Sequence, residues 1–454
     1  MKDYIQNVAL TFMFLFSFSF GGKGVIDSSM AVMLILMLCA AVHKRYFYIV
    51  WRFLSGLYFR NMVIMYLMIN AWAVFVVLVN GSSDISFFIT FFHMFLQLTC
   101  GIFLYAWFTY KNYEKRAIEY IMISFIIQAL IQWAAFGLPF VLDFVRLFQS
   151  ENTIAIGHKY GQTRALSISG SSFFGLAVSY GLVFIIFWSN ENRLCHKNRA
   201  VKWLFYSLMV TGTFFAGRTG YVGLALGLMC LVLKRKRKRR LTKGELAAGL
   251  AGILSLAGGI AWFIRASQIN RKLYTLFRIT FEVFINRITK GTFRTTSTDT
   301  LWSMYFKIPF ETFIAGDGIY TNADGSYYMF TDSGYMRQIL FIGVIGLFLL
   351  IVMQLCIIGW GKNDRAVRVF TLIYILVAEI KGETASWGLI LQGIVVLYSM
   401  QLHTAVETAG KGDGEAEKMN MGLFKGAGGM VAIEGGGYEK KRFKETFRGR
   451  LHRI

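Results

Sequence analysis

Apolar positions along the chain fall into long blocks that are separated by short polar connections. The blocks run for about 17–25 residues, the length that crosses a bilayer as an α-helix. The predicted spans are 5–20, 25–42, 61–80, 85–109, 117–142, 169–189, 201–216, 219–233, 244–264, 335–359, 367–380 and 387–403. This pattern predicts an all-α fold, a polytopic transmembrane bundle of about 12 helices.

Lys and Arg are unevenly distributed between the connections. The basic connections are 43–45, 111–116, 193–199, 234–240 and 362–368. The alternate short connections are 21–24, 80–84, 217–218 and 381–388, and they hold far fewer basic residues. Cytoplasmic loops of membrane proteins carry the excess of Lys and Arg, so the first set is predicted to lie inside. An even number of spans then places both termini in the cytoplasm.

Two connections on the predicted outer side are long, 143–168 and 265–334. The larger one contains an amphipathic stretch, Leu273–Ile288, whose apolar residues recur every three or four positions among arginines and a lysine. This pattern predicts a helix that lies on the outer membrane face. A helix packed on the spans beneath it is the equally weighted alternative.

Composition fits a membrane protein better than any soluble class. Of the 454 residues, 56% are hydrophobic and only 16% are charged, whereas soluble domains carry about 25% charged residues. The net charge is +23, but the basic residues lie between apolar blocks, so anionic lipid is a better partner than nucleic acid. Residues 405–454 are Gly-rich and basic without periodicity, which predicts a disordered cytoplasmic tail after a membrane domain at 1–404.

Metal and cofactor signals are weak in this sequence. The five cysteines form no C-x-x-C pair, and the chain has no D-x-D pair of carboxylates. We therefore predict neither a bound metal nor a cofactor.

Polar residues on the predicted outer side form three short motifs. The first is Arg164-Ala-Leu-Ser-Ile-Ser-Gly170, and the second is Ala216-Gly217-Arg218-Thr219-Gly220. The third begins at Arg294-Thr-Thr-Ser-Thr298 and continues through Gly316-Asp317-Gly318 to Thr331-Asp332-Ser333-Gly334-Tyr335. Binding and catalytic residues often lie in long loops, and charged residues close to the membrane interior are often functional.

Each charged residue in these motifs also has a structural interpretation. Arg164 could be an interfacial arginine that snorkels towards the headgroups, and Arg218 a turn residue that contacts lipid phosphate. Arg294 is one of several loop arginines. Asp332 precedes an apolar run, where an acidic residue often caps the helix N-terminus.

A functional interpretation connects the same residues. Several arginines at one membrane face, with few acids, suit a polyanionic group such as a diphosphate, because guanidinium groups bind phosphate oxygens in pairs. Sugar transfer from a lipid diphosphate needs a stabilised leaving group and a base for the acceptor hydroxyl. The arginines could replace a metal cation, and Asp332 could supply the base.

The order of these motifs resembles a known family. R-x-x-S-I-S-G-S before one span, G-R-T-G between two spans and T-D-S-G-Y-x-R at the end of a long outer loop are similar to the repeat-unit polymerases of O-antigen and capsule (Wzy-type). These polymerases belong to the wider O-antigen ligase/polymerase superfamily. The resemblance covers roughly Arg164–Gly346 and the layout of the spans.

The resemblance implies a metal-independent, inverting glycosyltransferase in the bacterial cytoplasmic membrane. Its substrate would be oligosaccharide units carried on undecaprenyl diphosphate, and a chain-length regulator protein is an implied partner. Arg164, Arg218 and Arg294 would hold the diphosphate, with Arg218 and Asp332 as the catalytic residues.

Two alternatives to a polymerase stay open. The related O-antigen ligases use a histidine in the large outer loop. Residues 265–334 contain none, and the outer candidate His158 lies in the smaller loop. This favours a polymerase over a ligase. A lipid-linked oligosaccharide flippase or other transporter would place ionisable residues within its spans, which are nearly free of charge here.

Overall fold

The structure is a computed structural model of the chain, and it describes residues 2–19, 27–194, 199–236, 265–359 and 364–403. These residues form helices and connecting loops, and no strand occurs among them. The prediction of an all-α fold is therefore confirmed for this part of the chain. The predicted span at 244–264 and the predicted tail at 405–454 lie outside the described residues.

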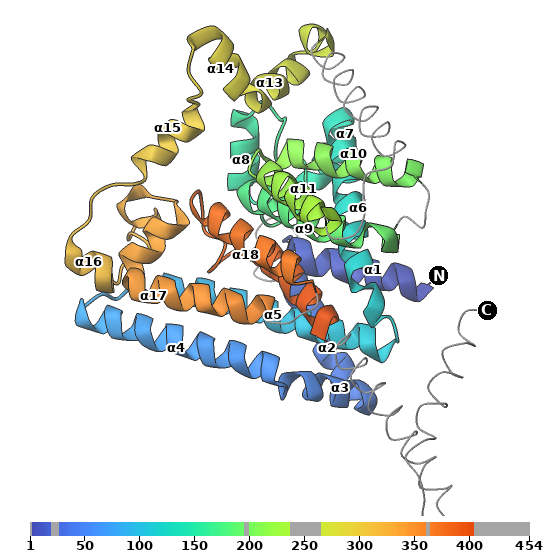
Figure 1. Cartoon of the computed structure of the whole chain (residues 1–454), viewed down its shortest axis with the longest axis vertical. Helices are drawn as coiled ribbons and strands as arrows, with labels where there is room; N and C mark the ends of the chain where they lie inside the picture. Colours follow the sequence, from blue (N-terminus) through green and yellow to red (C-terminus); the bar gives the residue numbers. More distant parts are fainter. Residues whose placement is uncertain (1, 20–26, 195–198, 237–264, 360–363, 404–454) are drawn as a thin grey trace, which may run out of the picture. The chain divides into compact units, whose positions relative to one another are not determined.

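Figure 1 shows the helices of the described residues in their order along the chain. The first half contains α1 (Lys2–Phe16), α2 (Ser28–Val42), α3 (Lys44–Leu54), α4 (Leu57–Val79), α5 (Ser86–Tyr110), η1 (Glu114–Arg116), α6 (Ala117–Gly137), α7 (Pro139–Arg146), α8 (Glu151–Lys159), α9 (Phe174–Leu194), α10 (Arg199–Ala216) and α11 (Gly220–Lys236). The second half contains α13 (Arg271–Thr280), α14 (Glu282–Lys290), α15 (Thr296–Ser303), α16 (Phe310–Ala315), η2 (Tyr328–Phe330), α17 (Gly334–Ile358), α18 (Arg365–Glu379) and a last helix, Leu389–His403.

Four of the described helical segments are long and apolar enough to cross a membrane: α4, α5, η1–α6 and α17. The pair α2 and α3, bent by 117°, would make a fifth if it counts as one span. Shorter apolar helices lie at four more of the predicted spans: Phe174–Trp188, Leu204–Ala216, Gly220–Leu233 and Leu389–His403. The structure thus shows a helical chain of membrane type. The count of twelve and the side on which the termini lie stay predictions.

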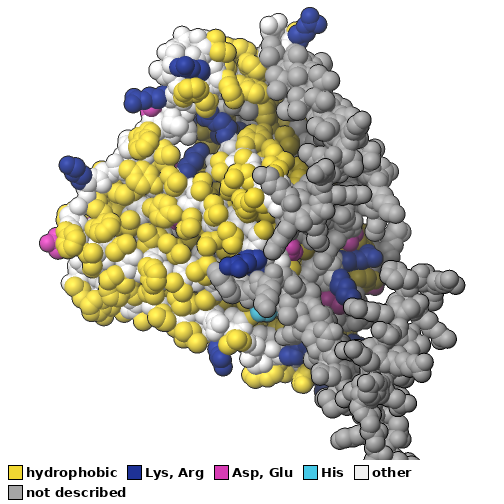
Figure 2. Space-filling model, in the orientation of Figure 1, with side chains coloured by type: hydrophobic (Ala, Val, Ile, Leu, Met, Phe, Trp, Pro, Cys, Tyr) yellow, Lys and Arg dark blue, Asp and Glu magenta, His cyan; other side chains and the backbone are white. Residues whose placement is uncertain are grey.

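The surface of α4 explains why a bilayer suits this fold. Met62 and Ile69 are buried against the neighbouring helices, whereas Leu67 is 59% exposed and Leu78 is 73% exposed. Figure 2 shows a broad hydrophobic surface over α4 and α17. Exposed apolar surface of this extent is unfavourable in water, and contact with lipid removes that cost.

The structure differs from the prediction at the start of α9. The span was expected from residue 169, but α9 begins at Phe174. The residues that precede α9, from Ala165 to Ser169, are buried and non-helical. The side-chain amide of Gln149 donates to the carbonyls of Ala165 and Ser167, each at 2.9 Å, and Gly170 N–H donates to Phe16 O at 2.8 Å. These bonds satisfy backbone groups that a helix would otherwise pair internally.

Contacts between distant connections follow the two sides predicted from charge. On the predicted outer side the linking pairs are Arg218–Glu282, Tyr305–Ile380 and Asp84–Tyr320. On the predicted inner side they are Tyr58–Ile357, Asp3–Lys111 and Lys115–Gln401. Connections assigned to one side therefore meet one another, and the candidate site lies at the predicted outer ends of the helices.

Candidate anion-binding site

Three cationic side chains from three separate connections share one patch. Arg164 lies in the loop between α8 and α9, Arg218 in the turn between α10 and α11, and Lys381 in the turn after α18. Lys381 Nζ donates to Thr219 Oγ1 at 3.5 Å, beside Arg218. Burial lowers the pKa of Lys381, and the positive charges of Arg218 and Arg164 lower it further. We call Arg164, Arg218 and Lys381 the basic patch. Figure 2 shows Lys and Arg side chains recessed among hydrophobic ones below α13 and α14.

Arg164 is held by an aromatic ring in this patch. Its guanidinium carbon lies 4.5 Å from the ring centroid of Tyr160, a cation–π contact. Burial lowers the pKa of Arg164, and the charge of Arg218 acts in the same direction. Its buried Nε has no hydrogen-bond partner among the described residues. A buried donor without an acceptor is costly, so this side chain is suited to an incoming anion.

Arg218 is paired with an acid that the sequence analysis did not connect with it. Its Nη2 lies 2.8 Å from Glu282 Oε2, and both side chains are about a quarter exposed, at 27% and 24%. Glu282 also accepts from the N–H and the hydroxyl of Thr296, at 3.2 and 3.3 Å. Burial alone would raise the pKa of Glu282, but these hydrogen bonds and Arg218 bring it below its usual value. The pair joins the α10–α11 turn to α14 and α15.

Asp332 lies beside the basic patch but does not cap α17. The residue at the cap position is Ser333, and its side chain makes no capping bond; its Oγ donates to Tyr305 Oη at 2.8 Å instead. The interpretation of Asp332 as an N-cap is therefore wrong. Asp332 is exposed at the surface. Partial burial of its carboxyl raises the pKa of Asp332, although the charges of Lys381 and Arg337 oppose the shift.

The third predicted arginine has no side-chain contact with this patch among those found for the described residues. Arg294 lies on the exposed connection between α14 and α15, where its carbonyl accepts from Asn286 Nδ2 at 2.7 Å. None of the contacts described here joins its guanidinium to the other cations. A role for Arg294 in diphosphate binding stays a prediction.

A second arginine–glutamate pair lies close to the first site and is enclosed. Arg337 Nη1 donates to Glu383 Oε2 at 2.9 Å, and the two side chains are only 7% and 4% exposed. The guanidinium carbon of Arg337 lies 4.0 Å from the ring centroid of Tyr320 and 3.9 Å from that of Tyr327. Tyr320 Oη donates to the same carboxylate oxygen at 2.5 Å. We call Arg337, Glu383, Tyr320 and Tyr327 the aromatic clasp.

Tyr320 of the aromatic clasp connects the outer loop with the α4–α5 connection and with Glu383 after α18. Asp84 Oδ2 accepts from the N–H groups of Tyr320 and Thr321, each at 2.7 Å, which ties the loop to the α4–α5 connection. Burial raises the pKa of Glu383, although Arg337 and the hydroxyl of Tyr320 oppose the shift. Glu383 is two residues from Lys381, and Arg337 is on the first turns of α17 after Asp332. The aromatic clasp therefore fixes the two segments that carry Lys381 and Asp332.

Sequence reasoning missed Lys381 and the aromatic clasp. The available signal was three charges within five residues, Glu379, Lys381 and Glu383, between two apolar runs. Arg337 is part of the T-D-S-G-Y-x-R motif, but its partners are far away in the sequence. Only the fold brings them together.

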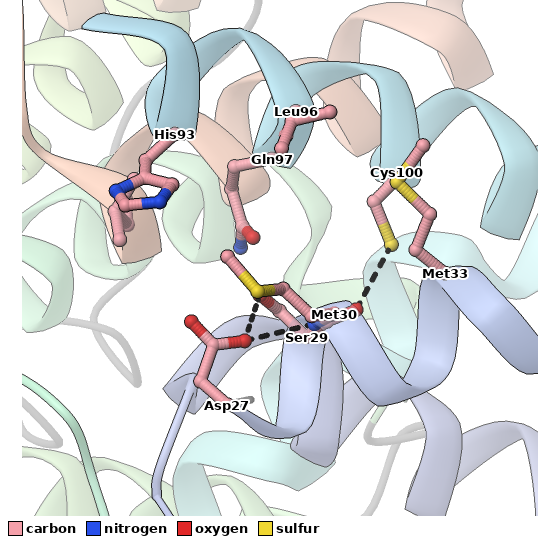
Figure 3. Close-up of a pocket in the computed structure, with 9 residues that line it drawn as sticks. Asp27, Ser29, Met30, Met33, His93, Leu96, Gln97 and Cys100 are labelled. Carbon is pink, nitrogen blue, oxygen red and sulfur yellow. Dashed lines mark hydrogen bonds between the residues drawn. The ribbon is translucent and has the colours of Figure 1, made fainter. Parts of the chain in front are cut away.

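A separate small pocket lies between α2, α5 and the start of the last helix (Figure 3). Several of its polar groups make hydrogen bonds within the protein. Asp27 accepts from Met30 N–H at 2.8 Å as the N-cap of α2, and Gln97 donates to Phe14 O at 2.9 Å. The Sγ of Cys100 lies 3.6 Å from Ser29 O. This pocket is distinct from the basic patch.

Comparison with known proteins adds no relative: no family model, no curated protein and no solved structure matches the chain. The resemblance to the polymerases thus rests on the chain's own motifs. Of the residues in those motifs, the fold gathers Arg164, Arg218 and Asp332 and adds Lys381 to them.

Proposed function

We propose that the protein is a membrane glycosyltransferase that polymerises oligosaccharide repeat units carried on undecaprenyl diphosphate. It would act on the outer face of the bacterial cytoplasmic membrane, for O-antigen, capsule or exopolysaccharide, without a metal. The observation that carries this proposal is the basic patch, three cations drawn from three connections, next to the carboxylate of Asp332.

Charge balance favours a polyanionic ligand for this patch. Three cations face two nearby acids, Glu282 and Asp332, and Glu282 is already paired with Arg218. Guanidinium forks bind phosphate oxygens bidentately, and Lys381 adds a compact charge. Partial burial strengthens such contacts relative to water. A diphosphate would satisfy the excess positive charge and the free Nε of Arg164.

The proposed reaction is a single displacement. The acceptor hydroxyl forms a bond to the anomeric carbon while the bond from that carbon to the diphosphate oxygen breaks. Asp332 takes the hydroxyl proton, and the diphosphate leaves with the bonding electrons as an anion stabilised by the basic patch. One displacement inverts the anomeric centre.

Purified protein in liposomes with lipid-diphosphate-linked repeat units tests the proposal. We expect longer glycans and released undecaprenyl diphosphate in the presence of a chelator. Movement of the lipid-linked units across the bilayer without longer products would indicate a transporter instead. Products that form only when a different acceptor is added would indicate a ligase.

The proposed topology has twelve spans with both termini in the cytoplasm. It predicts that Thr298→Cys is labelled from outside by an impermeant thiol reagent, whereas Thr242→Cys, after the basic run 234–240, is protected. Labelling with the opposite pattern would reverse the orientation and remove the basis for the enzyme.

A further inference from the structure

The amphipathic stretch of the large outer loop is divided into two helices with different surroundings. It breaks at Phe281, which separates α13 from α14. In α13, Leu276 is 2% exposed, and the Phe281 ring after it lies 6.4 Å from the Phe214 ring of α10. In α14, Phe284 is 64% exposed and Ile288 is 85% exposed. The first half therefore packs on the helices below, whereas the second half is attached through Glu282 and leaves Phe284 and Ile288 exposed.

The exposed residues of α14 continue into the turn that follows. Phe284 and Ile288 are four positions apart and share one helix face. Phe293, 63% exposed, lies under the guanidinium of Arg287 at 4.8 Å. Arg287 Nη1 also donates to Gly291 O at 2.6 Å, which closes the turn over the end of α14. Three large apolar side chains are thus exposed on α14 and the turn that follows it.

The charge around this apolar face is strongly positive. The basic residues of 282–294 are Arg287, Lys290 and Arg294, and the acid in the same stretch is Glu282. The negative charge of Glu282 is balanced by Arg218, so it does not neutralise the basic residues at the exposed end of α14.

We propose that α14 and the turn to Phe293 lie in the headgroup region of an anionic leaflet. Phe284, Ile288 and Phe293 would face the acyl chains, and Arg287 and Lys290 would contact lipid phosphate. Apolar burial and attraction to anionic lipid are the two forces that hold amphipathic helices at an interface. A protein partner would be less well matched to the excess of basic residues. This inference goes beyond the proposed function and does not depend on it.

The experiment compares two labelled positions on opposite faces of α14 in the full chain. Ile288→Cys and Lys290→Cys carry the same environment-sensitive fluorophore, with the labelled wild-type chain as the blank for its own cysteines. The protein is reconstituted in bilayers of phosphatidylcholine with or without phosphatidylglycerol. Lipids brominated high on the acyl chain quench from the membrane, and iodide quenches from water.

We expect the label at 288 to shift to the blue, to lose intensity with brominated lipid and to be protected from iodide. The label at 290 should respond more to iodide than to brominated lipid. Lipid quenching at 288 should increase when phosphatidylglycerol is present. Quenching of both labels by iodide alone would overturn the proposal. Protection of position 288 from both quenchers would overturn it too, since it would indicate a protein contact. Equal lipid quenching without phosphatidylglycerol would overturn the requirement for anionic lipid.

Discussion

Two arginine–glutamate pairs at the same end of the molecule have similar geometry and different surroundings. Arg218–Glu282 has an N···O distance of 2.8 Å, and Arg337–Glu383 has one of 2.9 Å. The side chains of the first pair are about a quarter exposed, whereas those of the second are less than a tenth exposed. Distance alone therefore does not separate a structural pair from a functional one.

The difference lies in what surrounds each guanidinium. Arg337 has aromatic rings at 4.0 and 3.9 Å and a compensating carboxylate, so its charge is balanced within the protein even though its Nε, like that of Arg164, has no hydrogen-bond partner among the described residues. Arg218 has two further cations near it and a partner that is open to solvent. Excess charge and access are the features that make the basic patch, and not the aromatic clasp, the candidate binding site.

The largest expected effect comes from breaking the enclosed pair. Glu383→Ala leaves Arg337 buried without a counter-charge, which costs about 3–5 kcal/mol of unfolding free energy. The thermal unfolding midpoint of the purified protein should fall strongly. Glu282→Ala is the matched control, and we expect it to cost about 1 kcal/mol or less because its pair is partly solvated. Equal losses in the two variants would contradict the distinction between clasp and patch.

Asp332→Asn tests the base without disturbing the clasp. The side chain does not cap α17, so the unfolding midpoint should stay near that of the wild type. An amide cannot accept the proton, and transfer should fall by about 10²–10⁴-fold. Product length and released undecaprenyl diphosphate measure the change. Near-normal turnover would remove Asp332 from the mechanism and direct the search to Asp317, to His158 or to Asp299, which lies in the first turn of α15.

Arg218→Ala and Arg164→Ala should each slow transfer by about 10²–10³-fold while the protein still folds. Arg218→Lys keeps the charge and loses the fork, so it should be clearly impaired but better than Arg218→Ala. Arg294→Ala, assayed in parallel, tests the exposed arginine, and the fold predicts a smaller loss there. Unchanged activity of Arg218→Lys would rule out bidentate recognition at this position.

The long apolar helices could be predicted from the sequence because hydropathy is a local property. The predicted span 335–359 matches α17, Gly334–Ile358, within a residue at each end. The late start of α9 could not be predicted, because it depends on Gln149 binding a loop more than ten residues away.

The candidate site was predicted only in part for the same reason. Arg164, Arg218 and Asp332 were selected from short motifs on the predicted outer side. Lys381 is far from all of them in the sequence, and its role depends on the packing of the last helices. The aromatic clasp draws on residues from 320 to 383, so no local pattern encodes it.

A smaller effect is expected from Glu282→Gln. Its carboxylate occupies Arg218 in the absence of substrate, so it competes with phosphate oxygens for the same donors. The amide can still accept from Thr296 and keeps α14 in place. We expect the affinity for undecaprenyl diphosphate, measured by titration of the purified protein at fixed ionic strength, to rise a few-fold. Weaker binding would show instead that Glu282 positions Arg218 for the ligand.

Lys381→Arg should have the smallest effect at neutral pH and a visible one in alkali. Burial and the charges of Arg218 and Arg164 lower the pKa of Lys381 from 10.5, so its charge is lost as pH rises through this lowered value. An arginine there stays protonated. The rate of transfer by the wild type should therefore decline at a lower alkaline pH than the rate of Lys381→Arg. The acid limb of the pH–rate profile is set by the raised pKa of Asp332, so it should be the same in both proteins. Lys307→Arg, an exposed lysine of the outer loop, is the control and should follow the wild type. Identical alkaline limbs in Lys381→Arg and the wild type would exclude Lys381 from anion binding and leave the two arginines as the patch.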